Sequence, residues 1–287
     1  MNELVVNGGH KAWYTAQLTI NKHPDASSFS VNFNRKASQS LSFQLAADYT
    51  AKTICEDFAG TDIYIGLSGG VDSEFVADVF YRNQIPFTPI ISIMPGMIEH
   101  KYAFYWCKQR NITPLVYEFH NNADVVNIAA SVLSRTPSYS FLHTLAVSFS
   151  TTMAMNRGGV FVAGEPDLTY KPTSDFYSPI TDNLELIAGD LTSEFCFPGK
   201  KNPGGFYWYT PELVAATAHE IDPNENFDVA RSKLYGVPYR PKQQQTRKNM
   251  YKESDIHKLI QIFKLDSMDD IPPLYWTKYS LYKALTD

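Results

Sequence analysis

The chain has 287 residues, enough for one large domain or two, and its 44% hydrophobic and 14% aromatic content can fill a substantial core. Its formal net charge of -5 gives no overall basic surface for nucleic acid. No apolar run approaches the length of a membrane span, and the N-terminus lacks the basic and apolar regions of a signal peptide. These features predict a cytoplasmic protein without a membrane partner.

The N-terminal region is expected to contain β structure. Between residues 11 and 33, two stretches alternate apolar and polar side chains on either side of the turn-rich segment 21–25. This pattern predicts a β-hairpin that forms either a lid on the main domain or an edge of its sheet. Residues 40–58 then carry apolar side chains at helical spacing.

The most informative stretch covers residues 63–73. A short apolar run ends in a Ser/Gly cluster and a helical pattern follows, which predicts strand, tight loop and helix. Two adjacent glycines leave no Cβ in the way of a ligand, and the free N–H groups of a helix start favour an anion there. Asp72 would repel a phosphate unless a cation lay between them. The loop is therefore best suited to a metal-bound polyphosphate.

The pattern of strand and helix then repeats along the chain. Strands are predicted at 87–93, 115–119 and 160–163, and helices at 99–110, 124–133 and 141–155. This alternation predicts a three-layer α/β/α domain with a mainly parallel, doubly wound sheet. Because ligands bind beyond the carboxyl ends of such strands, segments 68–73, 94–96 and 164–167 are expected to meet at one edge.

The six residues Ser68-Gly69-Gly70-Val71-Asp72-Ser73 resemble the SGGxDS signature of the PP-loop ATP pyrophosphatases. No Gly-Lys-Ser/Thr follows, so the loop is not a Walker A motif. The resemblance covers about residues 60–170. It implies the HUP-type fold of the adenine nucleotide alpha hydrolases, with ATP and Mg²⁺ as cofactors. It also implies that ATP is cleaved to AMP and pyrophosphate.

The resemblance also implies roles for individual residues. Asp72 would bind the metal, and the backbone of the second strand's end would meet adenine or ribose. The cofactor-binding set is Leu67, Ser68, Gly69, Gly70, Val71, Ser73, Ile91, Ser92, Ile93 and Gly164. The segment 164–167 partly resembles the Gly-Glu-Gly-x-Asp-Glu stretch of asparagine-synthase-type enzymes. Glu165 and Asp167 would then share the metal with Asp72; the alternative is a turn with two solvated acids.

Beyond residue 168 the pattern becomes irregular, and a helix is predicted over 211–219 with Thr210 as its N-cap. Residues 231–258 are strongly basic, and this segment has three interpretations. It could be a solvated surface, or an RNA-binding patch, which the acidic chain as a whole disfavours. It could also supply a cation to the leaving pyrophosphate, with Arg240, Lys242 and Lys248 as the candidates. Helices are predicted over 256–265 and 274–285.

The cysteines narrow the choice among subfamilies. Cys55, Cys107 and Cys196 form no CxxC pair, which disfavours a disulfide framework, a zinc site or sulfur transfer. We therefore expect a β-hairpin appendage (1–39), an ATP-binding core (40–170) and a substrate-side region (171–287).

The predicted function is an adenylating ligase closest to asparagine synthase without its glutaminase domain. It would act on a small-molecule carboxylate or amide carbonyl and take nitrogen from free ammonia, an ammonia-supplying partner or an amine. A tRNA-modifying enzyme and a non-catalytic nucleotide-binding protein are the alternatives, and the sequence leaves the oligomeric state open.

Overall fold

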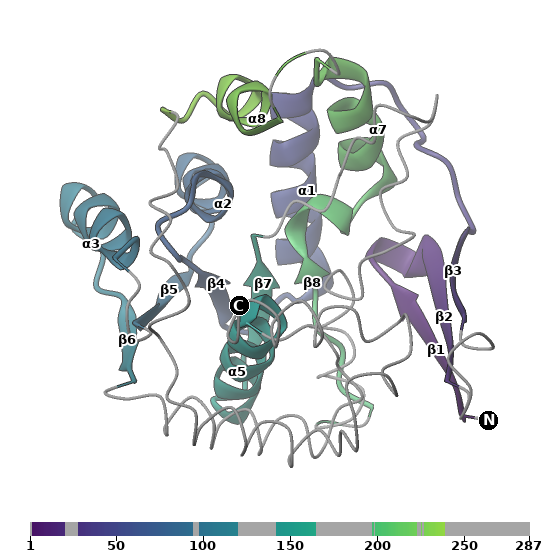
Figure 1. Cartoon of the computed structure of the whole chain (residues 1–287), viewed down its shortest axis with the longest axis horizontal. Coiled ribbons are helices and arrows are strands. Elements are labelled where there is room, and N and C mark those ends of the chain that lie inside the picture. Colours follow the sequence, from purple (N-terminus) through teal and green to yellow (C-terminus); the bar gives the residue numbers. More distant parts are fainter. Residues whose placement is uncertain are drawn as a thin grey trace, which may run out of the picture.

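The structure is a computed structural model that describes residues 2–20, 28–93, 98–119, 142–164, 197, 199–222, 225 and 227–238. In this part of the chain the strands form two separate sheets, one of three strands and one of five (Figure 1). The five-stranded sheet is the centre of the fold, and the three-stranded sheet lies beside it at the N-terminal end of the chain.

The central sheet is entirely parallel. Its strands are β4 (Ile63–Gly66), β5 (Thr88–Ile93), β6 (Leu115–Glu118), β7 (Val160–Ala163) and β8 (Gly204–Gly205), in the order β6-β5-β4-β7-β8. The chain leaves β4 toward β5 on one side and returns to β7 on the other. The sheet therefore has its topological switch point between β4 and β7, where α/β folds open a crevice at the carboxyl ends of the strands.

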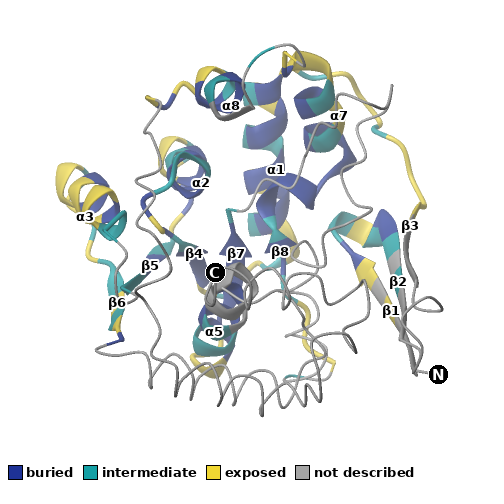
Figure 2. Ribbon diagram, in the orientation of Figure 1, coloured by how far each residue is buried: buried dark blue, intermediate teal, exposed yellow. Residues whose placement is uncertain are grey.

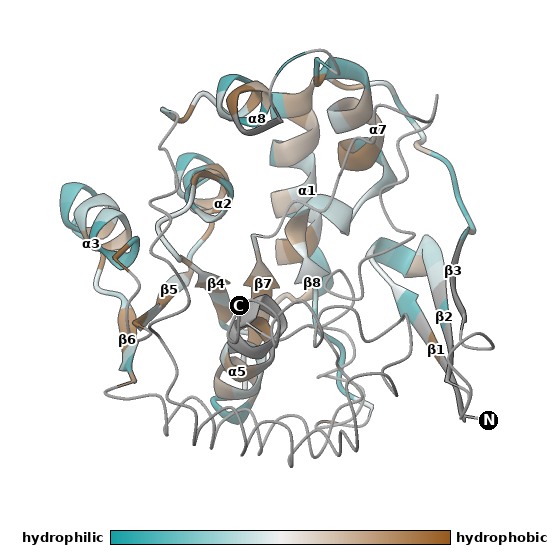
Figure 3. Ribbon diagram, in the orientation of Figure 1, coloured by the Kyte–Doolittle hydropathy of each residue, from teal (hydrophilic) through white to brown (hydrophobic). Residues whose placement is uncertain are grey.

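Helices cover both faces of this sheet. The helices α1 (Phe43–Asp57), α2 (Val71–Arg82) and α3 (His100–Gln109) lie on one face, and α5 (Leu142–Asn156) lies on the other. Successive residues of β4 alternate between the two: Ile63 and Ile65 pack with Phe75 of α2, whereas Tyr64 packs with Val147 of α5. Figure 2 colours most of β4 and β7 as buried, and Figure 3 colours much of the central sheet toward the hydrophobic end of its scale. The predicted three-layer fold is confirmed.

Residues beyond 200 belong to the same core. The 3-10 helix η3 (Phe206–Trp208) and helix α7 (Pro211–Glu220) pack against α1, and α8 (Phe227–Tyr235) packs against α2. Thr210 caps α7 as predicted, because its hydroxyl accepts a hydrogen bond from the backbone N–H of Leu213 at 3.4 Å. Its hydroxyl also lies 2.6 Å from that of Thr50 on α1. The C-terminal part of the described chain thus forms part of the helical layer over α1 and α2.

The N-terminal sheet consists of β1 (Asn2–Gly8), β2 (Tyr14–Ile20) and β3 (Ser28–Phe33), all antiparallel. The predicted hairpin is β2 with β3, and β1 adds a strand that the sequence did not predict. The hairpin is not an edge of the central sheet. It is attached through Trp13, whose ring stacks on Trp208 at 6.1 Å between centroids and whose indole N–H donates to the Trp208 carbonyl at 2.7 Å.

Several predicted segments lie outside the described residues, namely 94–96, 124–133, 256–265 and 274–285. The remaining predicted elements agree with the structure to within a few residues at their ends. Among the described residues, no helix combines the length and the apolar character needed to cross a membrane.

Candidate functional site

The loop between β4 and α2 contains two glycines with different surroundings. Gly69 has a φ of 93°, and a Cβ on it would lie 1.9 Å from the carbonyl oxygen of Glu99. This residue must therefore be glycine for the loop to lie against the start of α3. A Cβ on Gly70 would meet only the hydroxyl of Ser68, at 3.4 Å. Gly70 thus borders open space next to the first turn of α2.

The two serines of the loop bind each other. The hydroxyl of Ser73 lies 3.0 Å from that of Ser68, accepts a hydrogen bond from the backbone N–H of Ser68 at 3.1 Å and donates to the carbonyl of Gly70 at 3.1 Å. The N–H of Gly70 donates to the Ser68 hydroxyl at 3.2 Å. These bonds fix the loop immediately before the N–H groups of the first α2 turn, where the helix dipole favours negative charge.

Other strands end close to this loop. A Cβ on Gly164, the residue after β7, would lie 2.8 Å from the Cα of Ser73. Gly69 makes the close approach to Glu99, which precedes α3 and follows β5 in the chain. The carboxyl ends of β4, β5 and β7 therefore surround the first turn of α2 at the switch point of the sheet.

Asp72, in that first turn, is held by a residue of α8. The Nη1 atom of Arg231 lies 2.9 Å from both carboxylate oxygens of Asp72, and the side chains of Arg231 and Asp72 are 8% and 19% exposed. The hydroxyl of Tyr235 hydrogen-bonds to the same carboxylate, and that of Tyr207 donates to the backbone carbonyl of Asp72 at 3.2 Å. Burial raises the pKa of Tyr207 and Tyr235 well above the ordinary value, so both hydroxyls are neutral at physiological pH.

Of the three predicted metal ligands, only Asp72 is among the described residues. Among them, no group of three or more His, Cys, Asp or Glu side chains is placed to hold a metal ion. Both oxygens of Asp72 face the guanidinium of Arg231. Glu165 and Asp167, the other two predicted metal ligands, lie outside the described residues. What the structure describes of this site is therefore the N-terminus of α2 with an ion pair in its first turn.

The end of β5 and the start of α3 each carry a polar group with unused hydrogen-bonding capacity. The side-chain hydroxyl of Ser92 and the Nδ1 atom of His100 are buried, and neither has a hydrogen-bond partner in the described part of the chain. The carbonyl of Ile93 accepts from the N–H of Phe119 at 3.0 Å, whereas Ile91 is fully buried. Within the predicted segment 91–93, Ser92 is thus the residue best able to contact a polar ligand.

The surroundings of the cysteines show whether either described thiol could act as a nucleophile in sulfur transfer. Cys107 is buried on α3, and burial raises the pKa of its thiol to about 11, although Arg110 partly opposes this shift. Because the thiolate is the reactive form, Cys107 is inert at neutral pH. Cys55 is a partly exposed free thiol on α1, and Cys196 lies outside the described residues. Neither described cysteine is part of the loop region.

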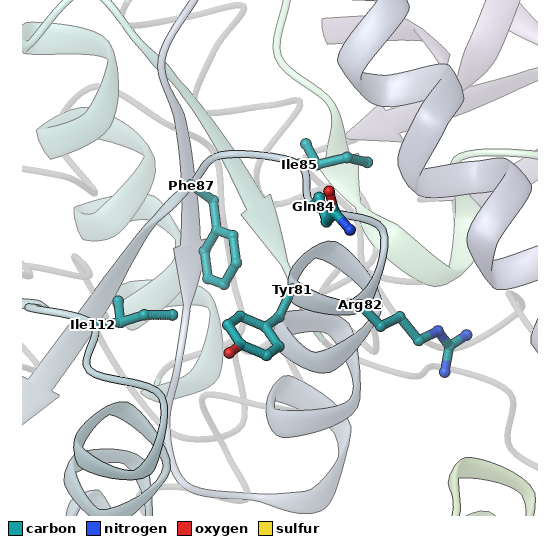
Figure 4. A pocket seen from close by; sticks show the side chains of 6 residues that line it. All are labelled: Tyr81, Arg82, Gln84, Ile85, Phe87 and Ile112. Atoms are coloured by element: carbon teal, nitrogen blue, oxygen red, sulfur yellow. The ribbon is translucent and has the colours of Figure 1, made fainter.

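A pocket of about 500 Å³ lies at the other end of α2 (Figure 4). It is lined by Tyr81, Arg82, Gln84, Ile85, Phe87 and Ile112. These residues end α2 or precede β5 or β6, so the pocket lies at the amino-terminal edge of the sheet. At about 1.5 Å of rise per residue, the length of α2 separates it from the loop by roughly 15 Å. The pocket is not part of the candidate site.

The sequence and the structure differ over the cation of the site. Arg240, Lys242 and Lys248, the predicted cations, lie outside the described residues, and their roles stay predictions. The cation that the structure brings to the loop is Arg231, which the sequence placed in the same basic segment without singling it out. In the sequence, the one feature that pointed to Arg231 as a cation of the site was its position within the basic segment 231–258.

Comparison with known proteins assigns no family. No protein family model matches the sequence, and no curated protein does so. An NH3-dependent NAD synthetase from Campylobacter jejuni is 13% identical with a TM-score of 0.32, covering 85% of this chain and 93% of that chain. NMN synthetase from Francisella tularensis is 12% identical with a TM-score of 0.35, covering 78% and 94%. The U34-tRNA thiolase NcsA from Methanococcus maripaludis is 14% identical with a TM-score of 0.40, covering 84% and 80%. Matches this distant add nothing to the sheet order and layers described above.

Proposed function

We propose that this protein is an ATP-dependent ligase of the PP-loop pyrophosphatase type. It cleaves ATP to AMP and pyrophosphate and adenylates a carboxylate or amide carbonyl of a small molecule. The observation that carries the proposal is the Ser68–Ser73 loop, which matches the SGGxDS signature and lies at the switch point of a parallel sheet. The asparagine-synthase-like chemistry is the specific form we favour.

The loop suits the polyphosphate of ATP. Gly70 borders open space, and the first turn of α2 directs its N–H groups and the positive end of its dipole toward that space. The loop lacks the lysine of a Walker A motif, so it is suited to holding the β- and γ-phosphates as a leaving group rather than to transferring the terminal phosphate. Ser92 and His100 offer buried polar atoms for the nucleoside.

The proposed reaction has two steps. An oxygen of the substrate carboxylate attacks the α-phosphorus of ATP. The bond between the α-phosphorus and the oxygen that bridges to the β-phosphorus breaks, and pyrophosphate leaves with that electron pair. An amine or ammonia then attacks the carbonyl carbon of the adenylate, AMP leaves, and the nitrogen loses a proton. Positioning and charge neutralisation would supply most of the rate acceleration.

The sulfur-transferring variant of this chemistry has less support. It needs a nucleophilic thiolate near the loop. Of the two cysteines that the structure describes, Cys107 is buried with a raised pKa and Cys55 lies on α1. Transfer RNA is an alternative substrate for the same adenylation, with a nucleophile other than sulfur. This alternative predicts RNA binding that weakens steeply as the salt concentration rises.

The test is product analysis from ATP in the presence of pools of carboxylates and amines. We expect stoichiometric AMP and pyrophosphate. Asp72→Asn should lower the rate by about 100-fold or more, because it removes the charge that pairs with Arg231 and orients it at the first turn of the loop helix. Lys233→Gln is the matched control: Lys233 lies on α8 but is 69% exposed and pairs with Glu225, so its rate should stay unchanged.

Two results would contradict the proposal. Release of ADP and phosphate would show cleavage at the wrong bond. ATP binding without turnover for every substrate pool would favour the non-catalytic alternative.

A further inference from the structure

The ion pair between Asp72 and Arg231 changes the charge of the candidate site. An aspartate in the first turn of the loop helix places a negative charge where a polyphosphate would bind. Arg231 approaches both of its oxygens at 2.9 Å and is almost fully buried. The pair carries no net charge, so the repulsion that otherwise calls for a metal ion is already neutralised by the chain itself.

The contact is specific to one face of α8. Arg231 and Tyr235 are four residues apart, which places them on the same side of the helix, and both bind the carboxylate of Asp72. Lys233, two residues from each, is exposed and pairs with Glu225 instead. The ring of Tyr235 stacks on Phe75 of α2 at 4.7 Å between centroids, which fixes α8 over the loop helix. The fold thus holds the guanidinium at the first turn of α2.

We propose that Arg231 is the fixed cation of this loop and that it binds the pyrophosphate end of the nucleotide. A guanidinium presents five N–H donors in a rigid plane, so it can hold a carboxylate along one edge and a phosphate along another. Hydrogen bonds between two charged groups are also strong where water is largely excluded. Asp72 is then a positioning residue, which orients the guanidinium. This inference rests on the proposed function in that it takes the loop to bind a polyphosphate.

The experiment measures pyrophosphate binding by calorimetry in EDTA, with no divalent metal present. We expect the wild-type protein to bind pyrophosphate without metal, and Arg231→Met to bind it about tenfold more weakly or worse, because a charge-assisted contact is lost. Lys233→Met removes the same charge from the same helix and should bind within about twofold of wild type, because exposed charges contribute little.

The variant Asp72→Asn distinguishes Arg231 as the cation of the loop from the alternative in which Asp72 binds a metal ion. If Arg231 is the cation, Asp72→Asn keeps that cation and removes a negative charge, so metal-free binding should stay within about threefold of wild type or become tighter. If Asp72 instead binds a metal, the wild-type protein will bind pyrophosphate only with Mg²⁺, and Asp72→Asn will abolish that binding. The second pattern overturns the inference.

Circular dichroism identifies the variants that fold. Should Arg231→Met fail to fold, Arg231→Lys carries the test: it keeps the charge but loses the planar fork, and we expect binding weakened by about threefold or more. Unchanged binding in a folded Arg231→Lys would overturn the inference.

Failure of the proposed function is distinguishable. A protein that binds pyrophosphate through Arg231 but releases no AMP from ATP would lose the proposed function and keep this inference. Normal release of AMP and pyrophosphate together with Arg231-independent binding would do the reverse.

Discussion

At the scale of single residues, the two glycines of the loop have separate tasks. Gly69 adopts a φ of 93°, which side-chain-bearing residues rarely adopt, and packs against the carbonyl of Glu99. Gly70 has an ordinary φ of -74° and serves as the N-cap of α2. The first glycine is needed for the fold of the loop, and the second leaves space beside the helix start.

This difference predicts opposite tolerance to alanine. Gly69→Ala should lower the free energy of unfolding by about 2 kcal/mol or more, because its Cβ would meet backbone and its φ is strained. Gly70→Ala should change it by less than about 1 kcal/mol, since the weaker N-cap is offset by a less flexible unfolded chain. Urea denaturation of the two variants checks this. Equal losses in both would show that Gly69 is not the constrained position.

The same residues show what the sequence could predict at this scale. The glycines, the serines and Asp72 are adjacent in the chain, so their common surroundings follow from local structure. The partner of Asp72 could not be found that way, because Arg231 is 159 positions away and stands among other basic residues. Only the packing of α8 on α2 selects Arg231 from that segment.

At the scale of elements, predictability followed the strength of the periodic signal. The strands β4, β5 and β7 are short apolar runs between turn signals, and all were predicted. β8 consists of Gly204 and Gly205, which carry no strand pattern, and it exists because their backbone pairs with β7. α8 has only nine residues and lies in a segment whose basic character dominated the interpretation. Tertiary contacts, rather than local propensity, define these elements.

The attachment of the N-terminal sheet gives a prediction at this scale. Trp13 is 3% exposed, stacks on Trp208 and Phe33, and bonds to the Trp208 carbonyl. Trp13→Ala should lower the free energy of unfolding by about 3–5 kcal/mol, because it leaves a cavity between the sheet and η3. Hydrogen exchange should accelerate most in residues 2–20 and 28–33.

Val5→Ala is the control for this variant. Val5 lies on β1 but is 49% exposed, so its truncation should change the free energy of unfolding by less than about 1 kcal/mol. If Trp13→Ala left hydrogen exchange in β1 to β3 unchanged, the contact with Trp208 would not be what attaches the sheet.

At the scale of the whole molecule, the described residues on either side of position 170 are joined by many contacts. Ser38 donates to Glu212 from both its backbone N–H and its hydroxyl, at 2.9 and 2.7 Å. Burial acts to raise the pKa of Glu212, but these hydrogen bonds, a hydrogen bond from its own backbone and the charge of Arg35 together outweigh burial, so the net shift lowers that pKa. The N–H of Phe43 donates to Glu220 at 2.6 Å, and Asp72 pairs with Arg231. The start of α1 and the loop helix α2 are therefore joined to elements that come more than a hundred residues later.

These contacts predict that the described core unfolds as one cooperative unit. Pulsed hydrogen exchange in increasing urea should give the same midpoint for peptides from β4 and α2 as for peptides from α7 and α8. Glu212→Gln removes a buried, charge-assisted contact with Ser38 and should lower the free energy of unfolding by about 1–2 kcal/mol. Because α7 and α2 share one core, that change should move both midpoints together. A shift confined to the α7 peptides, or two separate midpoints in the wild-type protein, would instead indicate that residues beyond 170 form an independent unit.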